Sequence, residues 1–166
     1  MNYIFTRPAW QLAIVSGICV GFAYQPWHLG LLVYIGFIPL IHTWFNHRSR
    51  DNFKSGYLFG LIYNFISNYW MGVNSGADFS VVLLSLISAV VYLALFWGIA
   101  GAIIGALRKD VNLYLILPFL IVCLEWVRSF GPLGYAWGNL ALTQTDYLPL
   151  LQNIDIVGTY GLTLWI

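Results

Sequence analysis

The stretch "FSVVLLSLISAVVYLALFWGIAGAIIGAL", residues 79–107, decides the fold class because it contains no Asp, Glu, Lys or Arg. About 20 mainly apolar residues are enough for a helix to cross the hydrocarbon core of a bilayer. An uncharged run of this length is typical of a membrane-spanning helix. The sequence therefore predicts a membrane protein.

The composition of the whole chain agrees with a lipid environment. Of its 166 residues, 60% are hydrophobic and 8% are charged, whereas soluble domains carry about 25% charged residues. The net charge of +1 gives no indication of a nucleic-acid partner. The chain is long enough for several membrane helices but not for a sizeable additional soluble domain.

Further apolar runs predict more helices. No Asp, Glu, Lys or Arg occurs from Pro8 to His47, and Pro26 divides this run into a hairpin because proline cannot continue a helix. We expect an all-α integral membrane protein, a polytopic bundle of five complete transmembrane helices and the start of a sixth. The expected bounds are 8–24, 27–46, 55–76, 79–107, 113–128 and, incomplete, 155–166.

The last of these runs is too short to cross a bilayer before the sequence ends at Ile166. We therefore expect residues 1–166 to be the N-terminal transmembrane domain of a longer protein.

The basic residues predict the orientation. Six of the seven Lys and Arg residues fall on one side of the expected helices: Arg7, Arg48, Arg50, Lys54, Arg108 and Lys109. Cytoplasmic segments are enriched in Lys and Arg. We expect a cytoplasmic N-terminus, a multi-pass arrangement, and a periplasmic interfacial loop over 129–154 that carries Trp137 and the turn-forming Gly131, Pro132 and Gly134.

Glycine spacing predicts close contacts between the helices. Three G-x-x-x-G pairs occur, at Gly17/Gly21, Gly56/Gly60 and Gly101/Gly105. Small residues at this spacing let helix backbones approach each other in lipid. The pairs support a compact bundle.

Polar residues in the third expected helix need partners in a membrane. Asn64 and Asn68 lie one turn apart, with Ser67 beside them and Asn74 further along. Hydrogen bonds between helices would satisfy them, and this is the favoured interpretation; a polar substrate cavity is the alternative.

No metal or cofactor is expected from the sequence. His28, His42 and His47 are spread over both predicted membrane faces, and their spacing does not resemble a metal site. Cys19 and Cys123 lie in apolar runs and are expected to be small buried hydrophobic residues without a neighbouring base.

Glu125 and Arg128 end the fifth expected helix, spaced by three residues. A cation suits a helix C-terminus but an acid does not, so Glu125 needs a partner or a hydrated groove. An intrahelical pair with Arg128 is the favoured interpretation. A role toward lipid, with Arg128 holding a phosphate group, is the alternative.

Several segments, in this order, resemble one enzyme family. "GFAYQPWHLGLLVYIGFIPL" (21–40), "GYLFGLIYNFISNYW" (56–70), "EWVR" (125–128) and "GYAWGNLALTQTDYLPLLQNIDIVGTYGLTLWI" (134–166) resemble the apolipoprotein N-acyltransferases. The family pattern reads F-P-W-x-x-L-G-Y-x-Q, then P-L-x-Q, then G-x-x-G-L-S-F. Matching positions are Trp137, Leu140, Gln144, Pro149, Leu150, Gln152, Gly158, Gly161 and Leu162.

Two positions depart from the family pattern. Tyr135-Ala136 stands where the family has Phe-Pro, and Leu142-Thr143 where it has Gly-Tyr. The resemblance therefore does not define the precise shape of this loop.

The resemblance implies an enzyme of the bacterial inner membrane. The family transfers an acyl chain from a phospholipid donor, through a cysteine thioester, to the N-terminal amine of a diacylated apolipoprotein acceptor. Its Glu-Lys-Cys residues lie in a nitrilase-like domain, which would follow Ile166 here, so no catalytic residue is expected in this chain. Candidate lipid-contacting or domain-docking residues are Glu125, Arg128, Trp137, Gln144 and Pro149.

Two other functions fit a bundle of this kind. A polytopic transporter would use the Asn64 and Asn68 face, although it would lack the mid-membrane acid or lysine that ion-coupled carriers commonly use. A non-catalytic lipid-binding scaffold is the other alternative. Transport by reconstituted vesicles, or lipid binding without acyl transfer, would favour one or the other.

Overall fold

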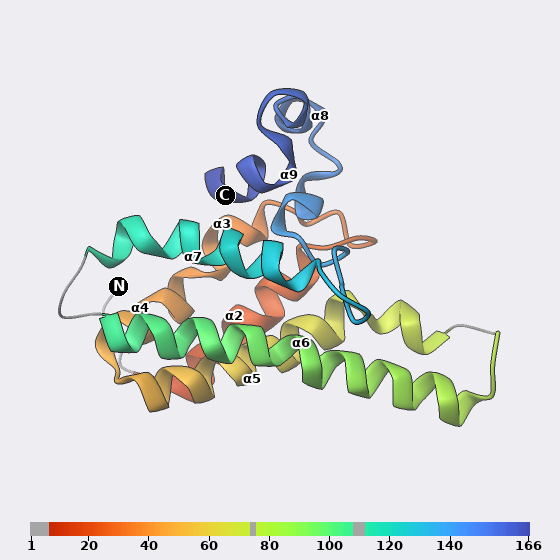
Figure 1. Cartoon of the computed structure of the whole chain (residues 1–166), viewed down its shortest axis with the longest axis horizontal. Coiled ribbons are helices and arrows are strands. Elements are labelled where there is room, and N and C mark those ends of the chain that lie inside the picture. Colours follow the sequence, from red (N-terminus) through yellow and green to blue (C-terminus); the bar gives the residue numbers. More distant parts are fainter. Residues whose placement is uncertain (1–6, 74–75, 108–111) are drawn as a thin grey trace.

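The computed structural model describes residues 7–73, 76–107 and 112–166, and in these residues every regular element is helical (Figure 1). The α-helices are α2 (Ala9–Phe22), α3 (Leu32–Gly36), α4 (Ile38–Asn46), α5 (Ser49–Ser67), α6 (Phe79–Leu107), α7 (Leu113–Arg128), α8 (Leu148–Leu151) and α9 (Ile154–Trp165). Two 3-10 helices accompany them, η1 (Tyr69–Val73) and η2 (Leu140–Gln144). The all-helical fold class is confirmed.

Helices α5 and α6 form the central hairpin of the fold (Figure 1). Their backbones touch at glycine pairs from both helices: a Cβ atom added at Gly56 would lie 2.3 Å from the carbonyl oxygen of Trp97. A Cβ at Gly101 would lie 2.3 Å from the carbonyl oxygen of Asn52. The expected role of these glycines in close helix contacts is confirmed.

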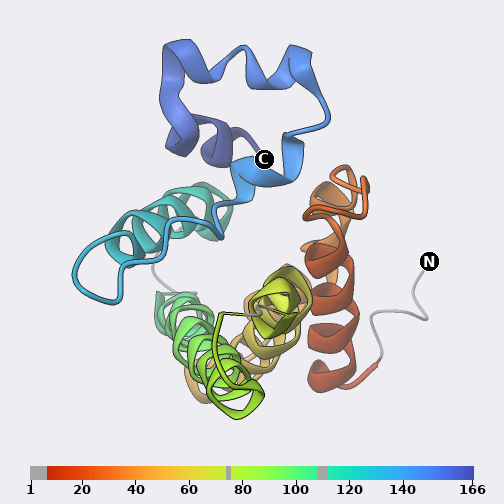
Figure 2. The same cartoon turned by 90° about the vertical axis from the view of Figure 1, so that its right-hand side faces the viewer.

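Helix α2 lies along the other side of α5, with its own glycine pair at the contact. A Cβ at Gly17 would approach the side chain of Ile62 to 2.9 Å, and one at Gly21 would approach Ile66 to 2.8 Å. Figure 2 shows α2, α5 and α6 grouped together, with the C-terminal part of the chain in a layer on the far side of α7.

Aromatic rings fill the space where the junction of α3 and α4 meets α5 and α6. Phe59 and Trp97 are both buried, and their ring centroids lie 4.9 Å apart in an edge-to-face arrangement. Phe37 and Tyr63 complete the group, at 5.6 and 5.8 Å from Trp97. Such pairs add about 0.5–1.5 kcal/mol each beyond the area they bury.

Among the residues that the structure describes, one helix, α6, is long and apolar enough to cross a membrane by length and composition. Helix α2 and the α3–α4 segment are apolar but shorter. The five complete spans predicted from the sequence are thus not confirmed as such.

Two of the expected helices have different bounds. The 27–46 helix is divided at Phe37 into α3 and α4 and begins only at Leu32, because residues 23–31 form the turn of the hairpin. The expected 55–76 helix begins earlier, at Ser49, and ends at Ser67, since Arg50, Asp51 and Lys54 occupy its exposed face without interrupting it. The chain then continues as η1.

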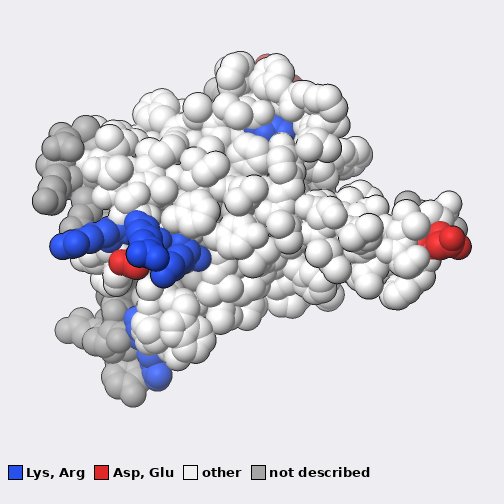
Figure 3. Space-filling view, turned by 60° about the horizontal axis from the view of Figure 1, so that its bottom comes forward, with Lys and Arg blue, Asp and Glu red and all other residues white. Residues whose placement is uncertain are grey.

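Charged side chains separate along the axis of the hairpin. Figure 3 shows Lys and Arg gathered at one end of the molecule and an acidic group at the other. Arg48, Arg50 and Lys54 belong to the start of α5, and Asp78 precedes α6 at the opposite end. Arg108 and Lys109, which the sequence analysis placed with the first group, lie outside the described residues, as does Asn74.

Candidate functional site

The end of α7 carries two ionisable side chains in the interior of the protein. Glu125 is 2% exposed and Arg128 is 3% exposed. One carboxylate oxygen of Glu125 accepts a hydrogen bond from the backbone N–H of Leu140 at 2.7 Å, and the other accepts from the Thr163 hydroxyl at 2.9 Å. Glu125 therefore joins α7 to α9 and to the loop over residues 129–154, called the outer loop below.

Arg128 fixes the preceding part of the same loop. Its guanidinium donates to the side-chain oxygen of Asn139 at 3.4 Å, and its carbonyl accepts from the N–H of Tyr135 at 2.8 Å. A Cβ at Gly138 would lie 3.2 Å from the guanidinium. The carbonyl of Gly138 accepts from Tyr24 and Tyr63, both at 2.9 Å.

The expected intrahelical ion pair is absent in the described part of the chain. Its one ion pair with an N–O distance within 4 Å is between His28 and Asp146. Glu125 and Arg128 each form hydrogen bonds with the outer loop instead. The loop folds back over the end of α7 and buries both side chains. This burial could not be inferred from a spacing of three residues.

Gln144 holds the other end of the loop. It is fully buried, and its amide donates to the carbonyl of Gly30 at 3.1 Å and to the hydroxyl of Thr143 at 2.8 Å. A Cβ at Gly30 would lie 2.0 Å from the carbonyl of Thr143, so the turn after α2 and the outer loop lie in direct contact.

Trp137 and Pro149 differ from the three buried candidates. Trp137 is 71% exposed, and Pro149 is exposed in the first turn of α8. The five candidates thus divide into three that hold the loop from inside and two on its surface.

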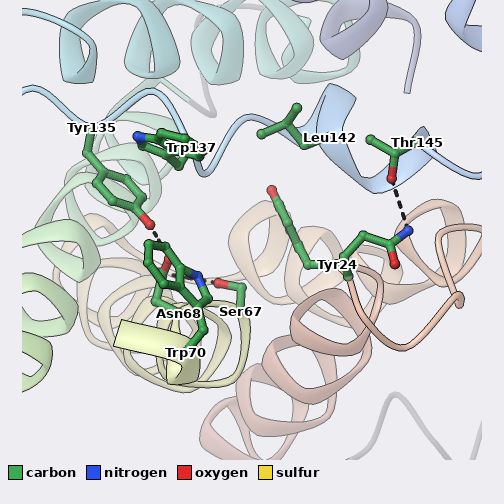
Figure 4. A pocket seen from close by; sticks show the side chains of 9 residues that line it. Tyr24, Ser67, Asn68, Trp70, Tyr135, Trp137, Leu142 and Thr145 are labelled. Carbon is green, nitrogen blue, oxygen red and sulfur yellow. Dashed lines mark hydrogen bonds between the residues drawn. The ribbon is translucent and has the colours of Figure 1, made fainter. Parts of the chain in front are cut away.

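A cavity of about 500 Å³ lies between this loop, the turn after α2 and the end of α5 (Figure 4). None of the described residues that line it is acidic or basic: Tyr24, Gln25, Ser67, Asn68, Trp70, Tyr135, Trp137, Leu142 and Thr145. Its volume is within the range of small-molecule sites.

The polar groups of the cavity are hydrogen-bonded to one another. Tyr135 donates its hydroxyl proton to the side-chain oxygen of Asn68, whose amide reaches the Ser67 hydroxyl at 3.4 Å. Burial raises the pKa of Tyr135 to about 12, and the nearby Tyr63 adds to the effect. Tyr135 is therefore protonated at neutral pH, and the cavity presents uncharged hydrogen-bonding groups among aromatic rings.

Hydrogen bonds also join the turn after α2 to the outer loop at the edge of the cavity. The amide of Gln25 donates to Asp146 at 2.7 Å and to the Thr145 hydroxyl at 3.0 Å, and the His28 ring nitrogen lies 3.0 Å from the Asp146 carboxylate. The hydrogen bond from Gln25 is the main reason that the pKa of Asp146 is lowered, with His28 adding to it.

The two asparagines singled out from the sequence have different surroundings. Asn64 is fully buried but donates within its own helix, to the carbonyl of Gly60 at 2.7 Å. Asn68 lines the cavity. The Asn64 amide therefore donates within α5, not to another helix as expected. The position of Asn68 agrees with the alternative, a polar cavity.

Several site residues carried no signal in the sequence. They are Tyr24, Tyr63, Asn139 and Thr163, whose hydrogen bonds join residues 11 to 114 positions apart. The one available indication was that Tyr24 precedes the hairpin turn at Pro26.

The structure describes all three histidines and both cysteines. Within the residues described by the structure, His, Cys, Asp and Glu form no group of three that could hold a metal ion. Cys19 and Cys123 are both free, Cys19 partly buried and Cys123 exposed. Burial of Cys123 was expected from its apolar run and is wrong, because its side of α7 faces outward.

Comparison with known proteins identifies the family. Residues 16–166 match the model of the apolipoprotein N-acyltransferase N-terminal domain. The chain is 29% identical to the apolipoprotein N-acyltransferase of Geobacter metallireducens over 162 residues, which cover 95% of this chain and 31% of the relative. For the enzymes of Caulobacter vibrioides and Methylococcus capsulatus, identity is 30% and 32%, covering 93% and 92% of this chain and 31% and 32% of those relatives.

These matches extend over nearly the whole chain but over only part of each relative. The chain spans about a third of the length of the curated relatives it matches. The model of the family's N-terminal domain matches residues 16–166. The chain therefore belongs to the apolipoprotein N-acyltransferase family and corresponds to its N-terminal domain.

Proposed function

We propose that this chain is the membrane platform of an apolipoprotein N-acyltransferase in the bacterial inner membrane. In the proposed reaction a cysteine thiolate attacks the acyl ester of a phospholipid, which gives a thioester and releases a lysophospholipid. The N-terminal amine of a diacylglyceryl-cysteine lipoprotein then attacks the thioester, forms an amide and releases the thiol.

The reacting groups are proposed to lie outside this chain. The cysteine and its assisting glutamate and lysine belong, by the family resemblance, to a nitrilase-like domain beyond Ile166. Glu125 is not proposed as the catalytic acid, because both of its carboxylate oxygens already accept hydrogen bonds inside the protein. Residues 1–166 alone are expected to have no transferase activity.

The uncharged cavity beside the outer loop supports this proposal most directly. Its walls combine the rings of Trp70, Trp137 and Tyr135 with the amide of Asn68. Aromatic and apolar walls suit an acyl chain, and a few uncharged hydrogen-bonding groups suit the ester or amide to which the chain is attached. The cavity would hold the lipid part of either substrate near the membrane surface.

The proposed arrangement in the membrane has five complete spans and a cytoplasmic N-terminus. The charge distribution supports it: Arg48, Arg50 and Lys54 lie at one end of α5, and the cavity lies at the other. Lys and Arg are enriched on the cytoplasmic side, so the cavity and residues 129–154 would face the periplasm.

The five candidate residues would serve this function in two ways. Trp137 and Pro149, on the surface of the loop, would contact lipid or the domain that follows. Glu125, Arg128 and Gln144 would act as positioning residues, because they hold the loop from its buried side.

An acyl-transfer assay with the complete gene product tests the proposal. The substrates are a phospholipid with a labelled acyl chain and a synthetic diacylglyceryl-cysteine peptide, and the product is the labelled N-acyl peptide. We expect transfer, and for Trp137→Ala we expect kcat/KM to fall about tenfold or more, which corresponds to about 1.4 kcal/mol of lost interaction.

Trp126→Ala is the matched control, since Trp126 is also an exposed tryptophan, on α7, but does not line the cavity. It should leave transfer near the wild-type rate. Lipid binding without any transfer by the complete product would instead favour the non-catalytic scaffold.

A further inference from the structure

We propose that a second cavity, at the start of α5, binds the headgroup of an anionic phospholipid. This cavity has a volume of about 350 Å³ and lies between the beginning of α2, the end of α4 and the first turns of α5. Its lining residues are Ala9, Trp10, His47, Asp51, Lys54, Ser55 and Leu58. The site is separate from the uncharged cavity of about 500 Å³ beside the outer loop, called the outer cavity below, and does not depend on the acyl-transfer reaction.

One exposed cation lines this cavity, and two more lie close to it in the sequence. Lys54 lines it, and Arg48 and Arg50 precede it on the same segment; all three are exposed. In the part of the chain that the structure describes, no ion pair within 4 Å joins any of them to an acid. Figure 3 shows Lys and Arg gathered at this end of the molecule. Basic pockets of this kind between membrane helices suit anionic lipid headgroups.

One acidic residue reduces the positive potential of the site. Asp51 lines the cavity and is exposed, but it forms no ion pair with Lys54 three residues later. Arg48, Arg50 and Lys54 against Asp51 leave an excess of positive charge, so the site attracts an anion overall. Removal of the Asp51 charge should therefore strengthen binding.

The cavity is amphipathic in the way that a phospholipid is. Leu58 lies four residues after Lys54 on α5 and therefore on the same face, about 6 Å further along the helix. Trp10, 54% exposed on α2, forms part of the same lining. A phosphate at Lys54 would thus have an apolar wall beside its glycerol and the upper part of its acyl chains, at the depth where tryptophan is enriched.

This apolar wall selects the membrane lipid over free phosphate. A phosphate ion would use Lys54 but would leave the side chains of Trp10, Ala9 and Leu58 uncovered. A lipid covers both parts, and its local concentration in the bilayer favours occupation. The proposed ligand is an anionic phospholipid of the leaflet at this end of the molecule, such as phosphatidylglycerol.

Lipid retention measures this site directly. The whole protein is exchanged into bilayer nanodiscs of equal parts phosphatidylglycerol and phosphatidylcholine, released into mild detergent, and analysed by native mass spectrometry for bound lipid. We expect preferential retention of phosphatidylglycerol. Lys54→Met keeps the length of the side chain but removes its charge, and should lower this preference about fivefold, the usual effect of one cation near a membrane surface.

Two matched acid variants separate a local site from the net charge. Asp51→Asn and Asp78→Asn each remove one negative charge, but Asp78 lies at the other end of the hairpin. Asp51→Asn should increase retention of phosphatidylglycerol, whereas Asp78→Asn should leave it unchanged. All three residues are exposed, so the variants should keep the wild-type thermal transition.

Three results would overturn the proposal. Equal retention by the wild type and Lys54→Met would exclude the Lys54 site, and equal gains with the two acid variants would show a net-charge effect only. Displacement of the retained lipid by millimolar inorganic phosphate would show that the site takes free phosphate. Acyl transfer is not part of this measurement, so failure here leaves the proposed enzyme activity standing, and loss of that activity leaves the lipid site standing.

Discussion

The two ends of α5 differ in how they are built. At its beginning, Arg48, Arg50 and Lys54 come from one short segment, are exposed, and have no ion-pair partner in the described residues. At its end, about 20 Å from Lys54 by the helical rise, Ser67 and Asn68 are buried under a loop that comes from residues 67 or more positions later in the chain. The beginning of α5 thus owes its properties to residues that are neighbours in the sequence. The end of α5 owes them to contacts between residues far apart in the sequence.

This difference separates the two kinds of lipid recognition proposed for the two ends. At the beginning of α5, neighbouring charges attract an anionic headgroup through a field that extends over several ångströms, and the apolar wall beside them comes from α2 and α5, not from the loop. An uncharged cavity has no such field and depends on shape and hydrogen bonds. The end of α5 at Asn68, called the outer end, should therefore be sensitive to changes that move the loop. The end at Lys54, called the inner end, should not.

The largest expected effect is the one that disturbs both ends together. In Gly56→Ala the new Cβ would lie 2.3 Å from the carbonyl oxygen of Trp97, so α5 and α6 must separate. Overpacking of this kind costs about 1–3 kcal/mol. We expect a lower thermal transition in detergent, together with weaker lipid retention at the inner end and a disturbed outer cavity.

Gly72→Ala is the control for this substitution. The nearest atom to its Cβ would be a terminal methyl group of Leu86 at 3.0 Å, which a side-chain rotation can move. If Gly72→Ala were as destabilising as Gly56→Ala, backbone contact between α5 and α6 would not be what holds the hairpin together.

The second prediction should separate the two ends. In Glu125→Ala the backbone N–H of Leu140 and the hydroxyl of Thr163 lose their acceptor. A buried donor left without a partner costs about 1–3 kcal/mol. We expect faster hydrogen exchange over residues 138–145, and lipid retention at the inner end should be unchanged.

Asp155→Ala is the matched control, because Asp155 is exposed in the first turn of α9. Unchanged hydrogen exchange in the loop of Glu125→Ala, or an equal increase with Asp155→Ala, would show that the carboxylate of Glu125 does not hold the loop.

The features predicted from the sequence follow the same division between local and tertiary structure. The uncharged run 79–107 became α6 and the glycine pairs became helix contacts, because apolar length and small side chains act within a few turns. The start of α5 was placed too late, since charged residues were used to end a helix that carries them on an exposed face.

The surroundings of Glu125 could not be predicted from neighbouring residues. Its spacing from Arg128 favours an intrahelical pair, whereas in the fold its partners lie 15 and 38 positions away. The hydrogen bonds of the outer cavity similarly join residues that share no periodicity. The family resemblance indicated that this loop matters, but not which of its side chains are buried.

The smallest expected effect tests one hydrogen bond of the outer cavity. Tyr135→Phe removes the donor to the side-chain oxygen of Asn68 and should lower the free energy of unfolding by about 1 kcal/mol at neutral pH.

The pH dependence of this stabilisation has a definite sign. Because the pKa of Tyr135 in the folded protein is raised to about 12, above its usual value near 10, folding favours the protonated phenol. The stabilisation is complete below about pH 10 and is lost as the pH rises through the folded pKa near 12. The stability difference between the wild type and Tyr135→Phe, measured by denaturant unfolding from pH 8 to pH 12, should therefore shrink over the upper two pH units. Tyr160→Phe removes a hydroxyl that donates to Ser129 outside the cavity and corrects for the general cost of deleting a tyrosine hydroxyl. A wild-type advantage that stays constant or grows up to pH 12 would show that Tyr135 does not act through its proton on Asn68, and the outer end of α5 would then depend on the shape of the loop alone.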